Sequence, residues 1–391
     1  MDTSLRETRE RERKQRESAG EREQEFSRVV YSEKKVGELR KKHMSKGLTS
    51  DESLSIILMG NQEHVNMLEE LGLSPNKRHE AIVEGKADYL VIACSDARIP
   101  RLDSEDDQLI GIQVRIAGNV VPKKGSPSFQ EISDAVSMLK PDGLVVVEGH
   151  CKCGACAERV KWVEKGMPDT GSAELNNLLH EVFGSTPDEN AMAQLTKARD
   201  TIPTGDRATG ALVYDWEKGG IQIVSANHSP ILEILVDNWN RRHTEAFEEG
   251  KLSQRLAKHR PHAIAVGTND LPYSLATIMH AKQNEIFSTT GSETGLDDMD
   301  KASILYAIEH LGVRHIPFVA PGTVSDNGKL REMFEGWETQ MKEMSVGGHK
   351  LIGELIDKGE LKISWLRYDL GSGSLVSIGG PAVTEGRKEA A

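Results

Sequence analysis

The stretch VIACSDARIP, residues 91–100, sets the interpretation of the whole chain. Its apolar first half is typical of a buried β-strand, and Cys94, Asp96 and Arg98 follow at alternate positions as that strand ends. A buried strand has no structural need for a thiol, a carboxylate and a guanidinium in this spacing, because each such group must find a partner when it leaves water. The spacing therefore indicates a chemical site at the end of a strand.

Apolar segments around this stretch predict an α/β fold. Strands are expected within residues 87–98, 110–121 and 142–156, the first and third running into loops, and ALVYDWEKGGIQIVSA (211–226) predicts a strand, a turn at Gly219-Gly220 and another strand. SFQEISDAVSMLK (128–140) has the apolar spacing of an amphipathic helix. Such alternation is typical of a mostly parallel sheet flanked by helices. Ligands of these sheets bind at the carboxyl ends of the strands, which is where Cys94 and its polar neighbours lie.

The same order of elements recurs in the second half of the chain. Each half is expected to open with a long helix, the first over 52–72 and ending at Gly72. With a shift of 172 residues, VIACSDARIP (91–100) matches AIAVGTNDLP (263–272), and ISDAVSMLK (132–140) matches ILYAIEHLG (304–312). The segments that close the two halves also match, VYDWEKGGIQIV (213–224) with RYDLGSGSLVSI (367–378). We infer an internal duplication.

The second copy keeps the apolar framework and loses the reactive groups. The aligned pairs are Cys94 with Val266, Asp96 with Thr268, Arg98 with Asp270, His150 with Gly322, and Cys153 with Ser325. These groups are therefore not needed to build the fold. We predict a charged tail, disordered or helical, over 1–50, a catalytic repeat over 51–227 and a degenerate, metal-free repeat over 228–391.

Cysteine usage indicates metal or redox chemistry. The four cysteines are Cys94, Cys151, Cys153 and Cys156, too closely spaced for a framework of disulfides that close long loops. Two thiolates and one imidazole, from Cys94, His150 and Cys153, suit tetrahedral zinc and leave a fourth position for water. Asp96 and Arg98 can form a bidentate pair that orients the carboxylate beside the metal.

Composition limits the class of protein. The chain has 391 residues, of which 37% are hydrophobic and 28% charged, as in globular proteins. Its net charge of −12 argues against a nucleic-acid or anionic-membrane partner. The apolar runs are shorter than the roughly 18 residues that span a membrane, and no apolar signal segment opens the sequence. We expect a cytoplasmic protein that acts on a small molecule.

The combined motifs resemble the β-class carbonic anhydrases. The segment CSDAR (94–98), followed after a further apolar strand by GHCKCGA (149–155), is similar to the paired zinc motifs of that family, and RIAGN (115–119) and YDW (214–216) are similar to two of its other elements. The likeness is good over 52–226 and degenerate over 228–380. Cys151, where the family often has serine, and the additional Cys156 depart from the pattern.

The resemblance implies a zinc enzyme that hydrates carbon dioxide to bicarbonate and a proton by metal-bound hydroxide. Cys94, His150 and Cys153 would bind Zn²⁺, and Asp96 and Arg98 would form the catalytic dyad. The family has four-stranded, mostly parallel sheets and active sites between two protomers. The two repeats would therefore form a pseudo-dimer, and the protein would be a homo-oligomer, a dimer of pseudo-dimers.

Two other functions stay open on the sequence alone. The same site could hydrolyse carbon disulfide or carbonyl sulfide, because the motifs do not distinguish these substrates from carbon dioxide. A different class, a thiol-disulfide oxidoreductase, would use Cys153 and Cys156 as a C-x-x-C pair. The metal hypothesis predicts that Cys94 is essential and Cys156 dispensable. The redox hypothesis predicts that Cys156 is essential and Cys94 dispensable.

Overall fold

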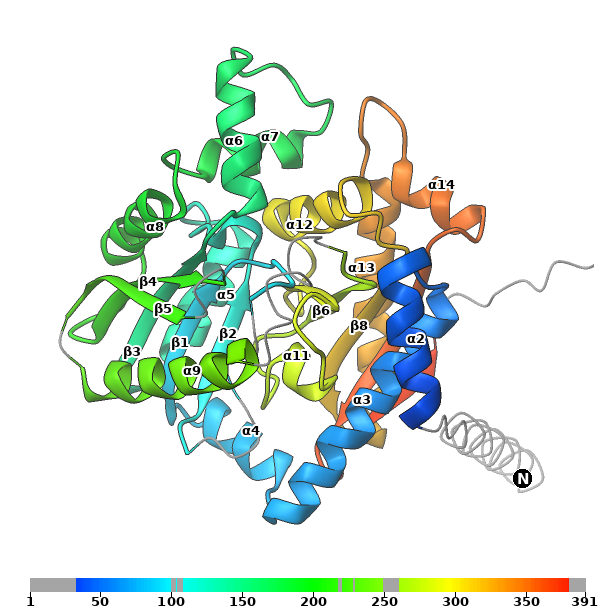
Figure 1. Cartoon of the computed structure of the whole chain (residues 1–391), viewed down its shortest axis with the longest axis horizontal. Helices are drawn as coiled ribbons and strands as arrows, with labels where there is room; N and C mark the ends of the chain where they lie inside the picture. The colour runs from blue at the N-terminus through cyan, green and yellow to red at the C-terminus, as the bar shows by residue number, and fades with distance from the viewer. Residues whose placement is uncertain are drawn as a thin grey trace, which may run out of the picture.

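The computed structural model describes residues 33–99, 103, 108–216, 220–227, 229–248 and 260–379. Within them the chain forms two five-stranded sheets, with helices packed around both (Figure 1). Most of the predicted charged tail, residues 1–32, lies outside the described residues.

The first sheet has the strand order β2-β1-β3-β4-β5. Its strands are β1 (Ala87–Ala93), β2 (Gly111–Arg115), β3 (Leu139–His150), β4 (Ala208–Asp215) and β5 (Gly220–Ala226). The first four are parallel, and β5 pairs antiparallel with β4. The expected α/β fold is confirmed. The family resemblance implied four strands, and the fifth, β5, is the second strand of the strand-turn-strand pattern predicted over residues 211–226.

The second sheet repeats this topology as β7-β6-β8-β9-β10. Its strands are β6 (Ala263–Gly267), β7 (Ile286–Thr290), β8 (His315–Gly322), β9 (Lys362–Asp369) and β10 (Leu375–Gly379). Strand directions match those of the first sheet one for one. β3 ends at His150 and β8 ends at Gly322, the residue that the 172-residue shift pairs with it. An internal duplication would produce this likeness, and the duplication itself stays a prediction.

Helices cover both sheets. In the described residues they are α2 (Glu33–Lys46), α3 (Ser50–Leu71), α4 (Pro75–Val83), α5 (Pro127–Ser137), α6 (Gly154–Glu164), α7 (Ala173–Glu181), α8 (Pro187–Thr201), α9 (Pro230–Glu248), α11 (Leu275–Ile278), α12 (Asp298–Glu309), α13 (Asn327–Glu343) and α14 (Leu351–Asp357), with 3-10 turns η1 (Ala117–Asn119) and η2 (Val324–Asp326). None of the helices described is long and apolar enough to cross a membrane. Gly72 ends α3 in the left-handed conformation, as predicted.

The two halves exchange their opening helices. α3 precedes the first sheet but packs on the second, where the Asn61 amide donates hydrogen bonds to the carbonyls of Ile278 and Gly373. In return α9 lies along the first sheet, and its Asn240 accepts a hydrogen bond from the backbone of Ile221 in β5 (Figure 1). Packing therefore crosses the predicted boundary between the repeats at residue 227, and each half contributes a helix to the packing of the other.

The sheets also meet directly along their β2 and β7 edges. The backbone N–H of Arg115 donates to Thr290 Oγ1 at 2.9 Å, and Thr289 Oγ1 donates to the Arg115 carbonyl at 2.9 Å. Next to them the N–H of Ser288 donates to the carbonyl of Ser95 at 3.1 Å. These bonds join the two halves as a pseudo-dimer and place the strand ends of the first sheet against the second half.

A buried histidine cluster anchors α2 and α3 on the second sheet. Ser53 Oγ lies 2.8 Å from Nδ1 of both His262 and His315, and His315 Nε2 lies 3.0 Å from Ser364 Oγ. The ring of His43 packs edge-on against His262. Burial lowers the pKa of all three histidines, and the pKa of His315 falls to about 3.

We predict that acid loosens this anchor. Below about pH 6.5 the unfolded chain protonates these histidines while the folded chain does not, so the stability that is complete above pH 6.5 is lost as the pH falls. Each histidine contributes a slope of about 1.4 kcal/mol per pH unit. Chemical unfolding at pH values between 7.5 and 5 measures how the free energy of unfolding depends on pH. His315→Gln removes one titrating group, so this slope is expected to fall by the contribution of about one proton. The same slope in His315→Gln as in the exposed control His349→Gln would contradict the prediction.

Candidate metal centre

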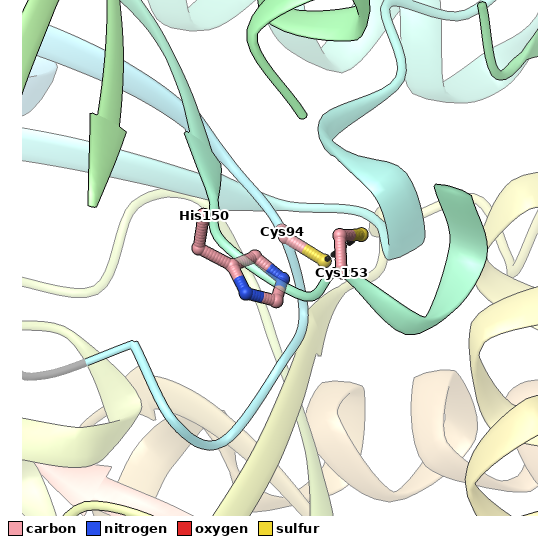
Figure 2. A group of neighbouring side chains, drawn as sticks. All are labelled: Cys94, His150 and Cys153. Carbon is pink, nitrogen blue, oxygen red and sulfur yellow. Dashed lines mark hydrogen bonds between the residues drawn. The ribbon is translucent and has the colours of Figure 1, made fainter. Parts of the chain in front are cut away.

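Three donor side chains meet at the carboxyl edge of the first sheet. Cys94 directly follows β1, His150 ends the neighbouring parallel strand β3, and Cys153 stands at the start of α6. Their sulfur and nitrogen atoms all lie within 4.8 Å of one another, and the two sulfurs are 3.9 Å apart. Figure 2 shows the side chains converging from the two strand ends and the loop before α6. Among the described residues, this is the one cluster of three such donors placed to hold a metal.

The His150 ring is oriented for metal binding. Its Nδ1 lies 3.0 Å from the carbonyl of Cys151, which can only accept, so Nδ1 carries the proton. Nε2 is then left with a lone pair, and it is buried without a hydrogen-bond partner. Orphaned buried nitrogens of this kind are rare, because they cost the desolvation energy of the group. A metal ion at this position would satisfy it, so the residues fit the group.

The two thiols are also set for a cation. Cys94 Sγ accepts a hydrogen bond from the backbone N–H of Gly118 at 3.2 Å, which suits a thiolate. Burial raises the pKa of Cys94 well above its usual range, and the neighbouring Cys156 thiol does the same for Cys153. Without a nearby cation both thiols stay protonated, whereas a coordinated metal deprotonates such thiols outright.

Asp96 and Arg98 form a buried ion pair beside the donors. The guanidinium donates through Nε to Asp96 Oδ1 at 3.0 Å and through a terminal nitrogen to Oδ2 at 2.6 Å. Arg98 also donates to the carbonyl of Lys152 at 3.0 Å, inside the loop between His150 and Cys153. Asp96 Oδ2 lies 3.6 Å from His150 Nε2. The pair therefore holds a carboxylate oxygen next to the atom that would bind the metal.

Neighbouring charged groups also shift the pKa of His150. Burial lowers the pKa of His150, but the Asp96 carboxylate and the Cys94 sulfur outweigh it, and the net shift is upward. Burial likewise lowers the pKa of Arg98, and its contact with Asp96 reverses that effect. The Asp96 carboxylate therefore acts electrostatically on the donor cluster even while it is paired with Arg98.

Comparison with known proteins fits this geometry. The carbonic anhydrase family model matches residues 89–204, which include all three donors and the ion pair. This part of the chain is similar to the carbonic anhydrases, and the matched segment is less than half of the chain. No curated protein sequence matches it.

Solved structures were found that resemble part of the chain. A tetrameric β-carbonic anhydrase from Sordaria macrospora is 18% identical over 38% of this chain and 95% of its own, with a TM-score of 0.28. The β-carbonic anhydrase CafA of Aspergillus fumigatus is 20% identical over 39% and 93%, with a TM-score of 0.29. A carbon disulfide hydrolase is 20% identical over 41% and 88%, with a TM-score of 0.27.

The sequence analysis assigned no site role to two charged residues around the donors, Arg115, which it quoted only within RIAGN, and Glu148. Arg115 is buried and donates to the carbonyl of Cys94 at 3.1 Å. Glu148 is buried two residues before His150, and burial raises its pKa to about 7 while Arg115 and His150 act to lower it. A single charge inside an apolar strand, as in VVVEGH, was the signal that could have identified them.

The second half contributes two further side chains. Gln283 donates from its amide to the hydroxyl of Tyr214 at 3.0 Å and to the carbonyl of Arg98 at 3.3 Å. The hydroxyl of Tyr306, on α12, lies 2.1 Å from the position that a β-carbon on Gly154 would occupy. Neither residue belongs to a motif, so only the packing of the two halves reveals them.

The additional cysteines do not favour redox chemistry. All four cysteines are free, and Cys153 and Cys156 are both buried. Reactive thiols are accessible and have a lowered pKa, whereas the pKa of Cys153 is raised. The geometry therefore supports a metal site rather than a disulfide exchange site.

We predict about one zinc per chain. Cys94→Ala removes a donor and is expected to lower zinc affinity by more than about 100-fold, since even indirect changes around such ligands cost about 10- to 100-fold. Cys156→Ala is the matched control and is expected to retain the metal. Elemental analysis and chelator competition measure both. Zinc retained in Cys94→Ala and lost in Cys156→Ala would refute the assignment.

A second prediction tests the contribution of α12. Gly154→Ala places a methyl group against the Tyr306 hydroxyl and displaces the adjacent Cys153, so zinc affinity is expected to fall at least about tenfold. Tyr306→Phe in the same chain removes that hydroxyl and should restore part of the affinity. Gly328→Ala, whose added carbon meets nothing within 4 Å, is the control. Equal affinity in Gly154→Ala and Gly328→Ala would show that the contact is unimportant.

Proposed function

We propose that this chain catalyses the reversible hydration of carbon dioxide to bicarbonate and a proton, with Zn²⁺ held by Cys94, His150 and Cys153. One observation carries this proposal. A buried Cys-His-Cys cluster lies beside the Asp96–Arg98 ion pair, inside the segment that matches the carbonic anhydrase family. A zinc ion bound there supplies a water-derived nucleophile near neutral pH.

The chain's own residues orient the reactants. Both Asp96 oxygens accept hydrogen bonds from Arg98, so the carboxylate has a fixed direction. Its Oδ2 faces His150 Nε2 and can only accept a proton in a hydrogen bond. We assign Asp96 the role of accepting a hydrogen bond from the attacking water, and Arg98 that of fixing the carboxylate.

A small pocket lies beside the ion pair, between the two halves. Its apolar side includes Ala97, Ile99, Ala281 and Ile286. Its polar side is formed by Arg115, Lys282, Gln283 and Ser288, and pockets that combine apolar walls with polar groups are typical of small-molecule sites. We propose that carbon dioxide reaches the metal centre past this pocket.

We also propose a cytoplasmic homo-oligomer. Four free cysteines are typical of a reducing compartment. In the described part of the first sheet, β5 is an edge strand, and Ile223 on it is 47% exposed. An open edge with exposed apolar side chains favours pairing with a second copy, which would give a dimer of pseudo-dimers.

Stopped-flow measurement of carbon dioxide hydration tests the function. The zinc-loaded protein is expected to be active, and Asp96→Asn to lose at least about 100-fold in rate, the lower range for groups that handle protons. The exposed Asp188→Asn is the control and should keep full activity. If the protein binds zinc and hydrolyses carbon disulfide or carbonyl sulfide but does not hydrate carbon dioxide, the substrate is one of these sulfur compounds and not carbon dioxide. Zinc binding with none of these activities would reject the function.

A further inference from the structure

Trp216 is joined to the metal histidine through one carbonyl group. The indole is buried, and its Nε1 donates to the Cys151 carbonyl at 3.1 Å. The same oxygen accepts the Nδ1 proton of His150 at 3.0 Å. A carbonyl oxygen has two lone pairs, so both bonds can form together. The position of this oxygen, and with it the angle of the imidazole, therefore depends on Trp216.

The ring of Trp216 also contacts the ion pair. The Arg98 guanidinium carbon lies 5.6 Å from the ring centroid, and the Lys152 ammonium lies 5.0 Å from it. Both distances are within the roughly 6 Å at which a cation is attracted to an aromatic face. One side chain thus contacts the arginine that fixes Asp96 and the loop that carries the donors.

That loop needs support because its backbone is strained. Lys152 has a φ of 52°, in the left-handed region that favours glycine over residues with a β-carbon. The loop is tied to β4 by the N–H of Cys151, which donates to the Tyr214 carbonyl at 2.8 Å. Trp216, which follows directly after β4, adds the second tie.

The second half of the chain provides an internal comparison. Aligning the two Tyr-Asp pairs, Tyr214 with Tyr368, places Leu370 at the position of Trp216. Leu370 is buried in the core, so an apolar side chain without a donor is sufficient for the fold there. The half that lacks the metal donors also lacks the indole N–H.

We propose that Trp216 is a positioning residue of the metal centre, which sets the His150 imidazole through the Cys151 carbonyl and steadies Arg98 through its ring. The effect on metal binding stands on geometry, and the effect on turnover rests on the proposed carbon dioxide hydration. Trp216 acts through the Cys151 carbonyl and the Arg98 guanidinium, so its role is to position other groups and not to take part in catalysis.

Two substitutions separate the two contacts. Trp216→Phe removes the N–H and keeps an aromatic face, and Trp216→Leu removes both. Trp337→Phe is the matched control, because that buried indole donates to the Ser292 carbonyl far from the site in sequence, at 2.9 Å. Zinc affinity is measured by chelator competition, and the absorption spectrum of the cobalt-substituted protein reports ligand geometry without reference to activity.

The expected result is a graded loss. Zinc affinity should fall about tenfold or more in Trp216→Phe, as for other partners of metal-binding histidines, and further in Trp216→Leu, and the cobalt bands should shift in both. Under the proposed function, the maximal hydration rate should fall more than KM changes. Trp337→Phe should match the wild type in all readouts. Wild-type affinity and an unshifted cobalt spectrum in Trp216→Phe would overturn the inference.

A measurement on the wild-type protein tests the same inference without relying on the folding of a variant. With ¹⁵N-labelled tryptophan, at least one indole N–H signal should move when zinc is removed and return when it is restored. No moving signal would overturn the role of Trp216. If the zinc-loaded wild type shows no hydration but Trp216→Phe still changes affinity and spectrum, the proposed function fails and the positioning role stands.

Discussion

The parallel pairing of β1 with β3 is the constraint on which the rest of the molecule depends. Parallel strands release their carboxyl ends at one edge, so Cys94 and His150, far apart in sequence, leave the sheet side by side. Because side chains alternate along a strand, a slip of one residue in this pairing would turn one donor away from the other. The ion pair, the start of α6 and the Trp216 contacts all support what this edge brings together.

The second half shows which residues the fold requires and which only the proposed chemistry requires. It builds a sheet of the same order and direction without any of the candidate reactive groups. It still takes part in the site, because it places Gln283 and Tyr306 against the first half and receives α3 in exchange for α9. The second half therefore contributes side chains to the surroundings of the candidate metal site.

The sequence predicted the features that local patterns record. Strand ends, the helix closed by Gly72 and the Cys94–His150–Cys153 grouping each follow from periodicity, capping or ligand type. It did not predict that α3 and α9 each pack on the sheet of the other half, or that Tyr306 lies against Gly154. Contacts between distant segments do not produce a periodic pattern in the sequence of either segment. The strand-turn-strand pattern of residues 211–226 predicted β5, the fifth strand of the first sheet, which the family resemblance alone did not supply.

Charge balance explains why this buried edge suits a divalent cation. Isolated charges are costly in a protein interior, and buried charges persist where opposite charges offset them. Asp96 has Arg98, and Arg115 is close enough to act on the pKa of Glu148. Two thiolates would remain as two negative charges without a partner. A divalent cation between them would offset these two charges, because metal binding takes up the deprotonated form of its thiol ligands. Burial raises the pKa of Cys94 and the neighbouring Cys156 thiol raises that of Cys153, so ionisation of these sulfurs is costly without such a cation.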